Sequence, residues 1–237
     1  MKNLNVLCLH GIGAKEDQPE FNEWMGVWTN YIREKTNENA IVDFLEFDEF
    51  FSKQKATFGD YFSFLKDAII GTSRLEKGKI KDFKEDYLDM IVEFFKYDSV
   101  SLNLRKHLKE KLSKKKYDII YAHSLGSIIC YDFFISENIN PAYNNITLIT
   151  SGSQLGHSNL PRFQPLQSLN VKAWYNLNNR FDRVLANKTV GNGINRCQDI
   201  KTHFWEGLFK LSHDGGKYLL KSDPELWKNI ERSYNYR

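Results

Sequence analysis

Apolar and polar positions alternate along the chain with two different periods. Runs rich in apolar and β-branched residues are typical of strands, and the sequence predicts six of them: 4–9, 41–47, 119–122, 145–150, 171–177 and 199–204. Between them, apolar residues recur at helical spacing, as in 21–35 with Trp24, Trp28, Tyr31 and Ile32. Strands that alternate with helices predict an α/β fold with a mostly parallel central sheet and helices on both faces.

Further helices are expected over 100–116, directly after residue 124, and at the end of the chain through Trp227 and Ile230. The helix over 100–116 has leucines on one face and lysines on the other, and it ends in Lys114-Lys115-Lys116. Positive charge at a helix end suits the helix dipole, so a solvated helix end is the first interpretation. Peripheral contact with a lipid surface is the second.

The stretch from about 48 to 97 differs from the rest because it is helical and unusually rich in Phe, Tyr and Ile. It reads as two helices inserted between a strand and the next regular unit. One interpretation is that these aromatics only pack on each other and on the core. The other is a lid with an apolar underside over the carboxyl ends of the strands.

Composition narrows the class of protein. The chain has 237 residues, 41% of them hydrophobic and 27% charged, which suits one globular domain spanning 1–237 with the helical insertion at about 48–97. The net charge of +3 is too small to predict nucleic-acid binding. Three scattered cysteines read as free thiols, and neither a signal peptide nor a membrane-spanning segment is expected, so the predicted location is cytoplasmic.

The chemistry is organised around Ala122-His123-Ser124-Leu125-Gly126. An apolar strand leads into this pentapeptide and an apolar helix leaves it, as at a nucleophile elbow, where a strained turn presents a Ser hydroxyl above the sheet edge. The usual pattern begins with Gly, and Ala122 keeps the side chain small there. The alternative interpretation is an ordinary strand–turn–helix crossover with Ser124 as the helix N-cap.

Loops at the carboxyl ends of the other strands supply further candidates. His10 and Gly11 follow the first strand in a glycine-rich loop that lacks the ending of a phosphate-binding loop. His157 follows Gly156 in a loop on the crevice side. With His123, which precedes the nucleophile and is expected to point away from its hydroxyl, these residues are candidates for substrate contact.

A serine nucleophile needs a base, and the base needs a carboxylate that fixes its tautomer. Asp182 follows a strand and His213 follows the last strand, which gives the order Ser, Asp, His expected on this scaffold. Asp199 lies at the wrong end of its strand, and Asp214 is too close to His213 to orient it. The predicted catalytic residues are therefore Ser124, Asp182 and His213.

Together, the His10-Gly11 loop, the 122–126 elbow, Asp182 and His213 resemble the α/β-hydrolase superfamily on its lipase and serine-esterase side. The resemblance covers nearly the whole chain except the helical insertion. It implies an oxyanion hole formed by the backbone N–H groups of Leu125 and Ile12. Two departures are Ala122 in place of Gly, and Arg183 where many relatives have Pro.

The sequence therefore favours a serine hydrolase that cleaves a small-molecule or lipid acyl ester through an acyl-enzyme, without a cofactor or metal. A thioesterase or acyltransferase would use the same residues, and a non-catalytic binding protein on the same fold is the alternative from another class. No His/Cys pair at ligand spacing predicts a metal site. The oligomeric state has no signal in the sequence.

Overall fold

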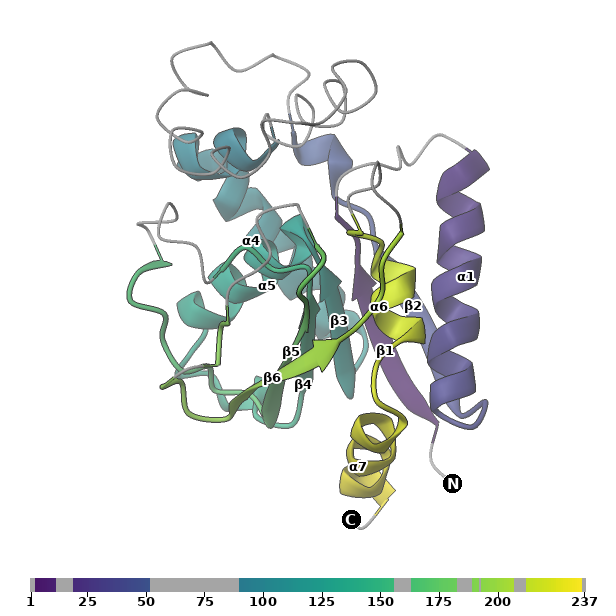
Figure 1. Ribbon diagram of the computed structural model, residues 1–237. Coiled ribbons are helices and arrows are strands. Elements are labelled where there is room, and N and C mark those ends of the chain that lie inside the picture. Colours follow the sequence, from purple (N-terminus) through teal and green to yellow (C-terminus); the bar gives the residue numbers. More distant parts are fainter. Residues whose placement is uncertain are drawn as a thin grey trace.

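The centre of the fold is a six-stranded sheet in which every neighbouring pair is parallel (Figure 1). The computed structural model describes residues 3–11, 19–51, 90–155, 163–182, 189–191, 193–206 and 212–235. The strands are β1 (Leu4–Leu9), β2 (Ala40–Leu45), β3 (Ile119–His123), β4 (Thr147–Ser151), β5 (Ala173–Asn179) and β6 (Cys197–Thr202). All six predicted strands are present, with ends shifted by a few residues.

The strand order is β2-β1-β3-β4-β5-β6. The chain therefore moves outward from β1 to β2 and then returns to place β3 on the other side of β1. In open parallel sheets, the crevice at such a reversal lies beyond the carboxyl ends of the two strands concerned. Here these are the ends of β1 and β3, which lead into His10-Gly11 and Ser124.

Helices cover both faces of the sheet, as predicted. Helices α4 (Asp98–Lys114) and α5 (Leu125–Ser136) lie on one face, and α1 (Pro19–Lys35), α6 (Gly215–Leu220) and α7 (Pro224–Asn235) lie on the other (Figure 1). Alternate residues of β1 enter two separate apolar clusters, Leu7 and Leu9 with α4 and α5, and Val6 and Cys8 with α1, α6 and α7. The two-layer core fixes the strand register and hence the position of each strand end.

The chain becomes helical at Gly215, where α6 begins, and Asp214 caps this helix by accepting from the Lys217 N–H at 3.2 Å. One detail differs from the sequence prediction. His203 is not in the last strand, since β6 ends at Thr202.

The predicted insertion over 48–97 is described only at its two ends. Short helix η1 (Asp48–Phe50) follows β2, and a helix covers residues 90–96. Ile91 and Phe94 are buried in the same cluster as Leu104 of α4. The lid predicted between these ends falls on residues 52–89, outside the described residues.

The remaining described elements add little to the site. A second 3₁₀ helix, η2 (Pro141–Tyr143), follows α5. Within the described ranges, no helix has the length and apolar character that a bilayer crossing requires.

Candidate active site

Ser124 occupies a strained turn between β3 and α5. Its backbone has φ 54° and ψ −122°, a conformation that non-glycine residues rarely adopt and keep only when their surroundings enforce it. Two backbone hydrogen bonds hold the turn: the Ser124 N–H donates to Ser151 O at 2.9 Å, and the Gly126 N–H donates to His10 O at 3.1 Å. This is the strand–turn–helix geometry of a nucleophile elbow.

Two glycines permit the turn to approach the first strand so closely. A Cβ atom on Gly126 would lie 2.6 Å from His10 O and 2.8 Å from Leu9 O, both backbone atoms. A Cβ on Gly11 would lie 2.6 Å from Ser124 Cβ and 3.1 Å from its Oγ. The backbone of the His10-Gly11 loop therefore packs directly against the serine side chain.

The structure brings together the three side chains expected to form the triad. His213 Nδ1 lies 2.6 Å from Asp182 Oδ2, and His213 Nε2 lies 2.9 Å from Ser124 Oγ. A carboxylate oxygen can only accept, so the proton between them belongs to Nδ1, and Nε2 faces the serine hydroxyl as an acceptor. This is the arrangement in which a histidine can remove the serine proton.

Asp182 and His213 reach the serine from the ends of neighbouring strands. Asp182 lies three residues beyond β5, where its N–H donates to Asn179 O. The side chain of Asn179 donates to the carbonyl oxygens of Phe204 and Ser212, which lie between the end of β6 and His213. Asn179, three residues before Asp182, is therefore bound to the residue directly before His213.

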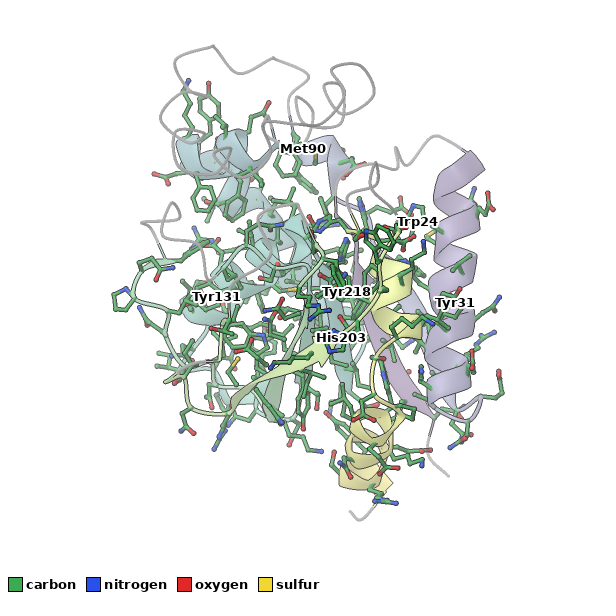
Figure 2. All side chains as sticks on the ribbon, viewed as in Figure 1. Trp24, Tyr31, Met90, Tyr131, His203 and Tyr218 are labelled. Carbon is green, nitrogen blue, oxygen red and sulfur yellow. The ribbon has the colours of Figure 1, made fainter. Side chains whose placement is uncertain are left out.

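Tyr218 binds the same carboxylate oxygen as His213. Its hydroxyl donates to Asp182 Oδ2 at 2.7 Å, and the ring is fully buried in the interior, where α6 faces the sheet (Figure 2). Burial raises the pKa of the Tyr218 phenol, and the adjacent carboxylate raises it further. The phenol is therefore a permanent donor.

His123 is buried under the base. Its Nε2 lies 3.0 Å from the backbone oxygen of His213, its Nδ1 lies 3.0 Å from Ser151 Oγ, and the two imidazole centroids are 4.7 Å apart. Burial, together with the nearby His213, holds the pKa of His123 well below its ordinary value, so the ring is neutral. Both ring nitrogens thus have protein partners, and the substrate contact expected of His123 stays a prediction.

The other sequence candidates have different surroundings. His10 is buried and stacks on Phe47 with a centroid distance of 4.3 Å, and its Nδ1 contacts Gly11 O. Leu125 begins α5, and its N–H has no hydrogen-bond partner among the residues that the structure describes. Ile12 and His157 lie outside those residues.

Sequence reasoning missed the second set of contacts around the histidines. Ser151 Oγ lies 2.7 Å from the Tyr121 hydroxyl, which also donates to Gly215 O at 2.7 Å. Glycines give the imidazoles room, because a Cβ on Gly152 would lie 2.7 Å from His213 Cε1 and one on Gly215 would lie 2.9 Å from His123 Cγ. The available signal was a glycine directly after Ser151, at the end of a predicted strand, and another directly after Asp214, which follows the predicted base.

In the described ranges, no group of three His, Cys, Asp or Glu side chains is placed to hold a metal ion. The three cysteines are free thiols, and burial raises the pKa of each, Cys197 to about 12.

The strand order, the helices on both faces and the elbow after β3 define a fold of the α/β-hydrolase type. No family model and no curated protein matches the chain. Among solved structures, it is similar to RedJ, a thioesterase from the prodiginine biosynthetic pathway in Streptomyces coelicolor, with 10% identity, coverage of 98% of this chain and 85% of that one, and a TM-score of 0.46. RedJ with a PEG molecule bound in its active site gives 10% identity, 98% and 90% coverage and a TM-score of 0.47.

The esterase domain of a Rhodothermus marinus protein is similar at 8% identity, with 97% and 86% coverage and a TM-score of 0.44. At these scores the neighbours carry no argument about chemistry.

Proposed function

We propose that the protein is a serine hydrolase that cleaves a carboxylic ester through an acyl-enzyme intermediate. The observation that supports this most is the unbroken line of contacts from Asp182 through His213 to Ser124, whose hydroxyl sits on a strained elbow. Strain of this kind at a nucleophile is maintained by the surrounding fold and is concentrated at functional sites. The substrate class is a small-molecule or lipid acyl ester.

In the first half-reaction, His213 Nε2 takes the proton of Ser124 as Oγ bonds to the acyl carbon. The negative charge that develops on the carbonyl oxygen is stabilised by the Leu125 N–H at the start of α5, with the Ile12 N–H as the proposed second donor. His213 then gives its proton to the leaving alcohol as the C–O bond breaks. Throughout, Asp182 stabilises the protonated imidazole.

In the second half-reaction, water replaces the alcohol. His213 removes a proton from the water molecule while the water oxygen attacks the carbonyl carbon of the acyl-enzyme. His213 then gives that proton to Ser124 Oγ as the acyl group leaves as a carboxylic acid. Ser124 is thereby regenerated and no cofactor is consumed. A thiol leaving group would follow the same steps.

The test is covalent labelling combined with one substitution. A fluorophosphonate should label wild-type protein at Ser124, and Ser124→Ala should abolish both labelling and hydrolysis of p-nitrophenyl butyrate, with turnover lower by on the order of 10⁴-fold. Ser136→Ala, which changes a serine at the far end of α5, is the matched control and should keep wild-type activity. Urea unfolding of both variants shows that the fold is retained.

Two results would contradict the proposal. One is hydrolysis by Ser124→Ala at close to the wild-type rate. The other is wild-type protein that neither reacts with the probe nor hydrolyses acyl esters of any chain length, which would favour a binding protein on this fold.

A further inference from the structure

Two donors converge on one oxygen of Asp182: His213 Nδ1 at 2.6 Å and the Tyr218 hydroxyl at 2.7 Å. We propose that Tyr218 is a positioning residue that holds Asp182 Oδ2 in line with His213, so that the short helix α6 is a working part of the site. The expected effect on kcat rests on the proposed function, whereas the placement of Asp182 by Tyr218 does not.

A carboxylate needs such a hold because its terminal torsion is soft. Rotation about the Cβ–Cγ bond of an aspartate has a broad, roughly two-fold preference, so a single hydrogen bond leaves the oxygen free to swing. Donors that approach one oxygen from two directions restrict that rotation. The Asp182 side chain is fully buried, so bulk water cannot donate a second hydrogen bond to its carboxylate.

Both donors come from one short segment of chain. Asp214, directly after His213, caps α6, and its carbonyl oxygen accepts from the Tyr218 N–H at 3.1 Å. The cap and the first turn of α6 therefore fix the spacing between the imidazole and the phenol. Movement of the imidazole relative to the phenol would have to break this turn.

The phenol ring is itself held in place. It meets the ring of Phe204 edge-on, with a centroid distance of 5.0 Å and an interplanar angle of 88°. The ring of His123 lies on another side at 5.9 Å. The hydroxyl of Tyr218 therefore reaches the triad through Asp182.

The substitution that isolates this role is Tyr218→Phe, which removes one oxygen and keeps the ring packing. We expect kcat for an acyl ester to fall about tenfold with KM unchanged, since a hydrogen bond to a charged group is lost without any change in substrate contact. Tyr143→Phe is the control, because Tyr143 is a comparably buried tyrosine in the cluster on the opposite face of the sheet. It should leave both constants within about twofold.

A second readout needs no turnover. The proton between His213 Nδ1 and Asp182 Oδ2 should give a low-field ¹H NMR resonance in the resting wild-type protein. In Tyr218→Phe that resonance should move or broaden, and in Tyr143→Phe it should not. An unchanged resonance together with an unchanged kcat would overturn the positioning role.

The same resonance separates the two proposals. If Ser124→Ala retains activity while the resonance still responds to Tyr218→Phe, the proposed function is wrong, but the positioning of Asp182 by Tyr218 is supported. If Tyr218→Phe does not fold, 2,3-difluorotyrosine at position 218 replaces it, because its more acidic phenol keeps the ring and donates more strongly to the shared oxygen. A resonance that does not shift in that variant would overturn the inference.

Discussion

The elbow and the acid–base end of the site are held by different kinds of contact. The turn at Ser124 is held by two backbone hydrogen bonds, from the Ser124 N–H to Ser151 O and from the Gly126 N–H to His10 O, and a Cβ on Gly126 would lie only 2.6 Å from His10 O. Asp182 and His213 are fixed mainly by side chains, among them Tyr218. The position of Ser124 therefore depends mainly on main-chain atoms, and the positions of Asp182 and His213 depend on individual polar side-chain atoms.

This difference separates stability from turnover. A substitution at the elbow that adds volume must displace strands β1 and β3, which lie inside the sheet. A substitution at the acid–base end can remove a proton acceptor or donor and leave the packing almost unchanged. The two regions should thus respond to mutation in different assays.

The largest effect is expected for His213→Ala, which should lower ester turnover by on the order of 10⁴-fold. In the proposed mechanism Ser124 and His213 act as one unit, so the double variant with Ser124→Ala should be no slower than either single variant. Single-turnover rates of the three variants provide the measurement. Losses that multiply in the double variant would show that the two residues act independently.

Next in size is the effect of Gly126→Ala on folding. The added methyl meets two backbone oxygens of the first strand and loop, so we expect the free energy of unfolding to fall by about 3 kcal/mol. Gly26→Ala is the matched control, since a Cβ there meets nothing within 4 Å, and it should raise stability by about 0.5–1 kcal/mol as a glycine in the interior of α1. Urea unfolding measures both, and equal effects of the two substitutions would remove the steric argument.

The smallest effect concerns His123, whose buried ring lies beside the backbone oxygen of His213. The pKa of His123 is held well below its ordinary value of 6.5 in the folded protein, whereas unfolded His123 takes up a proton near that pH. Protons therefore favour the unfolded chain as the pH falls below about 6.5, and this contribution is absent at higher pH. When the pH is lowered from about 7.5 to 5.5, the free energy of unfolding should decrease by about 1 kcal/mol more in the wild type than in His123→Phe.

Urea unfolding of wild type and His123→Phe at the two pH values tests this difference. The absolute stability of His123→Phe is not the readout, because that variant also loses two hydrogen bonds. Parallel losses in the two proteins would mean that His123 is charged in the folded state.

The sequence predicted the elbow because its determinants are local. A run of apolar residues, one serine and the small residues Ala122 and Gly126 are adjacent in the chain, and strand, turn and helix follow from them. The pairing of Asp182 with His213 also followed, because parallel strands deliver their loops to the same edge of the sheet. Order along the chain then limited the choice of acid and base.

What the sequence did not predict depends on contacts between distant segments. Tyr218 lies 36 residues from Asp182, and no pattern near either residue indicates their hydrogen bond. His123 was expected to contact substrate because it adjoins the nucleophile. Its burial depends on Gly152, which follows β4, and on Gly215, the first residue of α6.

Asp199, which was set aside as a candidate acid, lies in the outermost strand and has another consequence. Its carboxylate accepts from the Val190 and Gly191 N–H groups at 3.0 and 2.8 Å, and a Cβ on Gly191 would lie 3.0 Å from Cys197 O. Residues 190 and 191 are thus held against the edge of β6. An unpaired strand edge can pair with a strand of another molecule, and covering the edge is a common way in which proteins avoid aggregation. This carboxylate therefore helps to keep β6 from acting as a template for another copy of the chain.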